Sequence, residues 1–169
     1  MHSNILHSII NQLNASMQML EIAILNSNEE AWIFQNDSKE NMYFWEICAH
    51  IIFFLDFYFS TFDKNLKNIT DNYLLPDFLH KYSKNRLSNL KKMINKADMV
   101  RFYHHTKSKI NHYFENDISS QFEDQSGFPW LEMTKLELII YNVRHIMQHV
   151  DMLNQILKKL GLPVSNWIK

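Results

Sequence analysis

Glycine and proline are scarce in this chain, whose 169 residues include only two Gly and three Pro. Strand-rich folds need a tight turn between successive strands, and Gly and Pro supply many of those turns. A few long helices need far fewer turns. The sequence therefore predicts an all-α fold, and its length fits a single domain over residues 1–169 that can bury a sizeable core.

Apolar residues recur every three or four positions along four segments, which is the spacing of one buried helix face. We expect long helices at roughly residues 4–26, 39–64, 97–117 and 131–160. Asp37 or Ser38 can cap the second helix, while Gly161 and Pro163 mark the end of the last one. Residues 79–95 are basic and weakly amphipathic, which predicts a short extra helix or an inserted connection between the second and third long helices. Four helices around one core are the simplest arrangement.

The charge of the chain is balanced, with 17 Lys and Arg against 18 Asp and Glu. No basic stripe stands out, so we expect no nucleic-acid partner. The single cysteine, Cys48, excludes an intrachain disulfide and fits a reducing compartment, which predicts a cytoplasmic protein. The first residues lack the basic segment and apolar run of a signal peptide, in agreement with that location.

Residues 42–59 form a strongly apolar stretch that is nearly long enough to span a bilayer. Glu46, His50 and Asp56 interrupt it. A carboxylate near the centre of a membrane costs about 2.5–3.5 kcal/mol on insertion scales. Two carboxylates and an imidazole in one span therefore favour a buried helix, and we expect no membrane partner.

His145 and His149 lie four residues apart in an otherwise apolar helical segment, "IIYNVRHIMQHVDML" (139–153). Side chains at this spacing lie about 5–6 Å apart at Cβ, close enough for two imidazoles to bind one ion. His50 lies among apolar residues of the second helix and supplies a third possible ligand. Three neutral imidazoles in a bundle core are difficult to satisfy without a central ion. Three protein ligands leave a position for water, as in catalytic metal sites.

Other interpretations of these histidines stay open at the level of sequence. A histidine on an apolar face is often a core residue with ordinary hydrogen bonds, in a structural bundle that binds no metal. A haem held between His50 and His145 is another alternative, although it would make His149 redundant. Three further histidines flank the apolar face of the third helix, where we expect a solvated boundary: His104, His105 and His112.

Residues 137–157, "ELIIYNVRHIMQHVDMLNQIL", resemble the last helix of the DinB/YfiT-like superfamily, which carries an Asn-x-x-His-x-x-x-His motif. In this chain the motif corresponds to Asn142, His145 and His149. It follows the segment "FPWLEMTKLE" (128–137), which is similar to the segment that precedes the motif in that family.

Residues 44–60, "FWEICAHIIFFLDFYFS", are similar to the second helix of the same family, whose single histidine matches His50. The resemblance implies an antiparallel four-helix bundle that binds one divalent ion, zinc or nickel, through His50, His145 and His149. It also implies a homodimer, since relatives commonly form one.

The resemblance further implies a metal-dependent enzyme. Characterised members include thiol transferases that use low-molecular-weight thiols, and others are described as hydrolases of unknown substrate. A bound ion acting as a Lewis acid suits both, because it activates a thiol or water towards a small electrophilic substrate. A non-catalytic metal-binding or sensing protein is the alternative. Glu46 and Asn142, each one turn before a ligand, are candidates for contact with the ligands or the substrate.

The chain departs from the family motif directly after His149. Many members continue with a small residue, Gly and Gln, where this chain has Val150, Asp151 and Met152. Asp151 lies about 200° around the helix from His149, since each residue of an α-helix turns by about 100°. We therefore expect Asp151 to point away from the metal.

Overall fold

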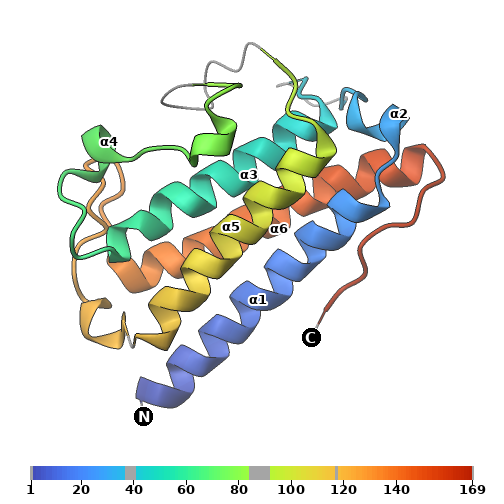
Figure 1. Cartoon of the computed structure of the whole chain (residues 1–169). Helices are drawn as coiled ribbons and strands as arrows, with labels where there is room; N and C mark the ends of the chain where they lie inside the picture. Colours follow the sequence, from blue (N-terminus) through green and yellow to red (C-terminus); the bar gives the residue numbers. More distant parts are fainter. Residues whose placement is uncertain (1, 37–40, 84–91, 117, 169) are drawn as a thin grey trace.

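The computed structural model describes residues 2–36, 41–83, 92–116 and 118–168. Its four long helices are α1 (His2–Asn26), α3 (Phe44–Phe59), α5 (Lys96–Glu115) and α6 (Lys135–Lys159) (Figure 1). Shorter helices occupy the connections: α2 (Glu29–Trp32), η1 (Ser60–Phe62), α4 (Ile69–Asn72), η2 (Asp77–Leu79) and η4 (Ile118–Gln121). The described residues form no strand beyond two isolated bridges, so the expected all-α fold is confirmed.

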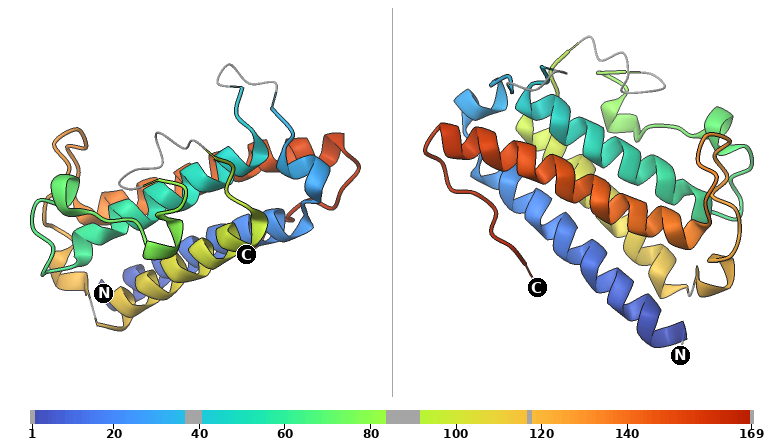
Figure 2. Two further views of the ribbon diagram at one scale, coloured as in Figure 1. Left: turned by 45° about the horizontal axis from the view of Figure 1, so that its top comes forward. Right: turned by 180° about the vertical axis from the view of Figure 1, so that it is seen from behind.

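The four long helices lie side by side but do not alternate in direction. α1 and α6 run one way, and α3 and α5 run the other way (Figures 1 and 2). α6 packs against α1 and α3, while α5 packs against α3 and α1. Neighbouring helices are therefore parallel in two pairs, α1 with α6 and α3 with α5, and antiparallel in the other two. The family resemblance implies an antiparallel bundle and gives no indication of the parallel pairs.

The parallel pairing of α3 with α5 explains the long segment between them. The 16 residues of α3 extend about 24 Å at 1.5 Å per residue, and the chain must return over that distance before α5 begins. Residues 63–95, called the crossover below, make this return and carry α4 and η2 (green in Figure 1). The extra helix or insertion expected at residues 79–95 falls within the crossover. Residues 84–91 lie outside the described part of the chain, and the flanking parts form turns and irregular structure.

α3 begins later than the sequence predicts. The expected caps, Asp37 and Ser38, lie outside the described residues. In the structure the helix begins at Phe44, and the Glu46 carboxylate accepts a hydrogen bond from the backbone N–H of Tyr43 at 2.9 Å. That contact satisfies a polar group at the helix start that has no partner inside the helix.

Both ends of α6 are set by local hydrogen bonds. The helix begins after Thr134, whose hydroxyl accepts from the backbone N–H of Glu137, while the Glu137 carboxylate accepts from the N–H of Thr134. This reciprocal cap places the start four residues later than predicted. At the other end Gly161 has φ +68°, and the N–H of Leu162 donates to the carbonyl of Leu157. The prediction that Gly161 marks the end of the helix is confirmed, and its left-handed conformation is the one that glycine adopts readily at this position.

α3 is the most deeply packed of the long helices. The segment Phe44–Phe62 has the length and composition of a membrane-crossing helix, but 83% of that window is buried inside the protein. Within α3 only Glu46, His50 and Phe54 are partly exposed, and they follow one another at intervals of four residues. Most of its apolar surface is thus already covered by protein, which is what a core helix requires.

One carboxylate is buried on α3 and is fully paired. Asp56 accepts hydrogen bonds from the hydroxyls of Tyr73 (2.6 Å) and Thr106 (3.2 Å). Lys109 Nζ lies 3.1 Å from the same carboxylate and also donates to the Ser60 hydroxyl. Burying a charge is costly unless it is paired and hydrogen-bonded, so this cluster fixes α3, α5 and the crossover relative to one another.

Replacing Asp56 by Asn should lower the free energy of unfolding by about 2 kcal/mol, because the charge of Lys109 loses its partner. This loss of stability is smaller than that expected on breaking a fully buried ion pair, since the Lys109 side chain retains 21% exposure. Urea denaturation followed by circular dichroism measures the change. Asp151→Asn is the matched control on the exposed face of α6 and should change stability by less than about 0.5 kcal/mol. Equal effects of the two substitutions would contradict the structural role of Asp56.

Candidate metal centre

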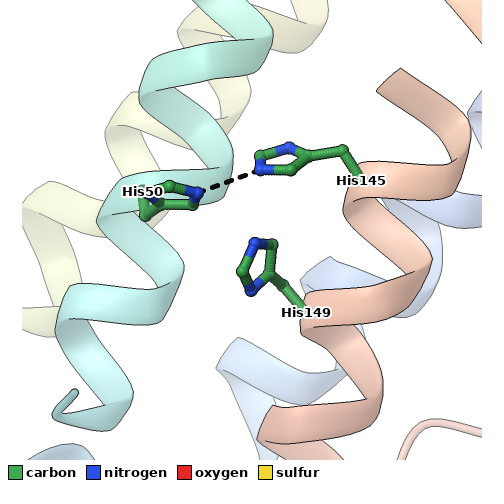
Figure 3. Close-up of side chains that lie close together, drawn as sticks. All are labelled: His50, His145 and His149. Carbon is green, nitrogen blue, oxygen red and sulfur yellow. Dashed lines mark hydrogen bonds between the residues drawn. The ribbon is translucent and has the colours of Figure 1, made fainter. Parts of the chain in front are cut away.

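Three histidines meet where α3 and α6 face each other. His50 projects from α3, and His145 and His149 project towards it from α6 (Figure 3). The Nε2 atoms of His50 and His145 are 3.0 Å apart, and one ring nitrogen from each of the three lies within 4.8 Å of the others. The structure thus brings together the three side chains that the sequence singled out.

The three histidines lie along a partly exposed seam between the two helices. His149 is 8% exposed, and His50 and His145 are only half-buried. This differs from the core position expected for His50 on an apolar stripe. The reason is that His50 belongs to the one partly exposed stripe of α3, together with Glu46 and Phe54. The site is therefore in contact with solvent along the seam.

The environment keeps two of the imidazoles neutral. The pKa of His50 is lowered from 6.5 to about 4, chiefly by burial and in addition by the neighbouring His149. The pKa of His145 is lowered to about 3, again chiefly by burial, with smaller contributions from His149 and His50. Removal from water disfavours the charged ring, and like charges nearby disfavour it again. Neutral rings with a free nitrogen lone pair are the form that binds metal ions.

The donor set and its spacing fit a divalent metal ion. Two nitrogens bound tetrahedrally to one ion at 2.0–2.1 Å lie about 3.3 Å apart, close to the 3.0 Å between His50 and His145. The buried Nδ1 of His145 has no hydrogen-bond partner in the described residues, and neither has the buried Oδ1 of Asn142. An ion on Nε2 of His145 leaves the proton on Nδ1, which is the outer N–H that metal-binding histidines offer to an acceptor.

Aromatic rings surround the half-buried histidines. The Phe54 ring packs edge-on against His50 with 4.8 Å between ring centroids. Tyr141 stacks on His145 at 6.1 Å with 8° between the ring planes, and Tyr58 lies against Tyr141. Neither Phe54 nor Tyr58 was predicted to belong to the site. The signal was present in their spacing, because Phe54 and Tyr58 follow His50 by four and eight residues and so lie on its side of α3.

The two polar candidates named from the sequence have other contacts. Glu46 caps the start of α3, as described above. Asn142 is fully buried and its Nδ2 donates to the carbonyl of Leu138 at 2.8 Å. A direct role of either side chain towards a ligand or substrate stays a prediction. Asp151 is exposed and accepts a hydrogen bond from Gln155, so it points away from the histidines as expected.

The remaining candidates take no part in this site. The three histidines expected at the boundary of the third long helix are exposed on α5: His104, His105 and His112. Cys48 is buried, and burial raises the pKa of its thiol well above the usual range, which disfavours the reactive thiolate. Haem does not fit between His50 and His145. Two nitrogens bound on opposite sides of an iron lie about 4 Å apart, which is twice a bond of about 2 Å and longer than the separation of the two Nε2 atoms given above.

Comparison with known proteins identifies no relative. No family model, no curated protein and no solved structure matches this chain. The resemblance to the DinB/YfiT-like superfamily therefore depends on the residues quoted above. The case for a metal site depends on the geometry, burial and charge of the three histidines themselves.

The stability of the metal-free protein should fall as the pH decreases from about 6.5 towards 3. In the unfolded chain the rings bind protons below pH 6.5, whereas folded His50 and His145 stay neutral until about pH 4 and 3. The unfolded state then binds more protons, so stability is complete above pH 6.5 and is lost on acidification. Urea denaturation across this range gives the slope of the free energy of unfolding against pH. In His145→Gln this slope should correspond to about one proton fewer than in the wild type. An unchanged slope would contradict the neutral state of His145.

Proposed function

We propose that this protein binds one divalent metal ion, zinc or nickel, through His50, His145 and His149. The observation that carries the proposal is the convergence of three imidazole nitrogens within 4.8 Å from two facing helices. It is the one such group of potential metal ligands in the described residues. The lowered pKa values of His50 and His145 support it, because an ion needs the neutral rings.

The proposal includes membership of the DinB/YfiT-like superfamily, with four long helices arranged as in its bundles. Its support is that the second and last long helices carry the motif residues and that their histidines face each other. Four packed helices with one long crossover also belong to the known range of helical bundles. A cytoplasmic homodimer is part of the same proposal and depends on the resemblance and the single cysteine.

A metal-dependent transferase or hydrolase is the activity that this site suits best. When bound, the ion supplies Lewis acidity towards a thiol or water that attacks a small electrophile. The chain itself supplies three ligands for the ion. Because His50 and His145 are only half-buried, the site stays accessible from solvent. Tyr141 offers an aromatic surface beside His145 against which an apolar substrate can lie. A low-molecular-weight thiol is the proposed co-substrate.

A non-catalytic metal-binding or sensing protein is the second candidate. It is supported by the rings of Phe54 and Tyr141, which pack directly against His50 and His145. The two candidates differ in whether the ion keeps an exchangeable position.

Purified protein without a tag should contain about one zinc or nickel ion per chain, measured by mass spectrometry of the metals. His149→Ala should reduce this content at least about tenfold, because one of three ligands is lost. His105→Ala, on the exposed face of α5, is the matched control and should retain the metal. A wild-type protein that takes up neither zinc nor nickel would refute the proposed function, provided circular dichroism shows it folded.

Cobalt-substituted protein should change its visible spectrum when a small thiol is added, because the ion's open position accepts a fourth ligand. A changed spectrum would indicate an open position on the ion and would justify assays of thiol transfer and hydrolysis. An unchanged spectrum at millimolar thiol would favour the non-catalytic candidate. The His149→Ala variant serves as the control for cobalt bound elsewhere.

A further inference from the structure

Met152 contacts the edge of His149 that faces away from the other two histidines. Met152 lies on α6 one turn after His149, and its Sδ is 3.3 Å from His149 Nδ1. In Figure 3 one ring nitrogen of His149 points towards His50 and His145, while the other points away from them. Because Nδ1 is the nitrogen beside Met152, Nε2 is the nitrogen directed at the site.

This arrangement determines which nitrogen carries the proton when the site is filled. A neutral imidazole has one N–H and one lone pair, so binding an ion through Nε2 leaves the proton on Nδ1. That N–H then points at the thioether sulfur of Met152 within hydrogen-bond distance. Metal-binding histidines usually donate this outer N–H to a carboxylate or a carbonyl, which raises the basicity of the ring. A thioether is a much weaker acceptor.

We propose that Met152 is a positioning residue for the metal centre. Met152 holds the His149 ring with Nε2 towards the ion and, as a weak hydrogen-bond acceptor, leaves that ring a weak electron donor to the ion. The proposal rests on the metal-binding function inferred above. It makes the ion more readily exchangeable than at a site where a carboxylate or carbonyl supports the same histidine. The neighbouring Asp151 does not supply a carboxylate acceptor for His149, because Asp151 is turned to solvent and accepts a hydrogen bond from Gln155.

The affinity for zinc tests the proposal directly, by competition with a chromophoric chelator. Met152→Gln places an amide oxygen of similar reach beside Nδ1 and should bind zinc about tenfold more tightly. Met152→Leu keeps the bulk but removes the acceptor, and should weaken binding about threefold to tenfold. Met147→Leu is the matched control, because Met147 is a partly buried methionine of the same helix, and it should bind as wild type.

Nuclear magnetic resonance of the ring nitrogens in the zinc-loaded protein provides a second measurement. The proposal expects zinc on Nε2 of His149 and a proton on Nδ1. Zinc on Nδ1 would overturn it, as would affinities of the Leu and Gln variants within twofold of wild type. These failures are distinct from failure of the proposed function, in which the wild-type protein itself binds no zinc.

Discussion

The close approach of α3 and α6 is the condition on which the candidate site depends. A tilt or shift of either helix by one residue would separate the Nε2 atoms of His50 and His145, which are now 3.0 Å apart. Two helices hold α3 and α6 in place, since α5 supports α3 from one side and α1 supports α6 from another. The buried cluster around Asp56 adds polar contacts between α3, α5 and the crossover. The histidines therefore depend on packing well beyond their own neighbours.

The position of the site at the edge of the core reconciles two opposing requirements. Burial has to be sufficient to keep the imidazoles neutral, because protonated rings repel a cation. Exposure has to be sufficient for the proposed ion to enter. His50 and His145 satisfy both, since they are half-buried and have lowered pKa values. The exposed stripe of α3 is a single line of residues, so access is confined to one side.

The sequence predicts the helices better than it predicts their arrangement. Periodicity located the four long helices, and Gly161 marked the end of α6, because both signals are local. The parallel pairing of α3 with α5 is a tertiary property that periodicity does not carry, although the long segment before α5 was a clue. At the site, spacing identified His145 and His149 and could also have pointed to Phe54 and Tyr58, whereas the contact of the Met152 sulfur with His149 requires knowledge of side-chain direction. The start of α3 at Phe44 coincides with the Glu46 cap, which a prediction based on the more usual capping residues did not find.

The pairing of α1 with α6 has a consequence for how the protein assembles during synthesis. These two helices form the most extensive contact between elements, yet they are separated by more than half of the chain. On the ribosome, α1, α3 and α5 emerge first and leave the face that α6 will cover without a partner. Contacts between distant parts of a chain form slowly. Since α6 also brings two of the three histidines of the site, a nascent chain without α6 carries only His50 of that set, and the proposed ion can find its three ligands only after the last helix has docked.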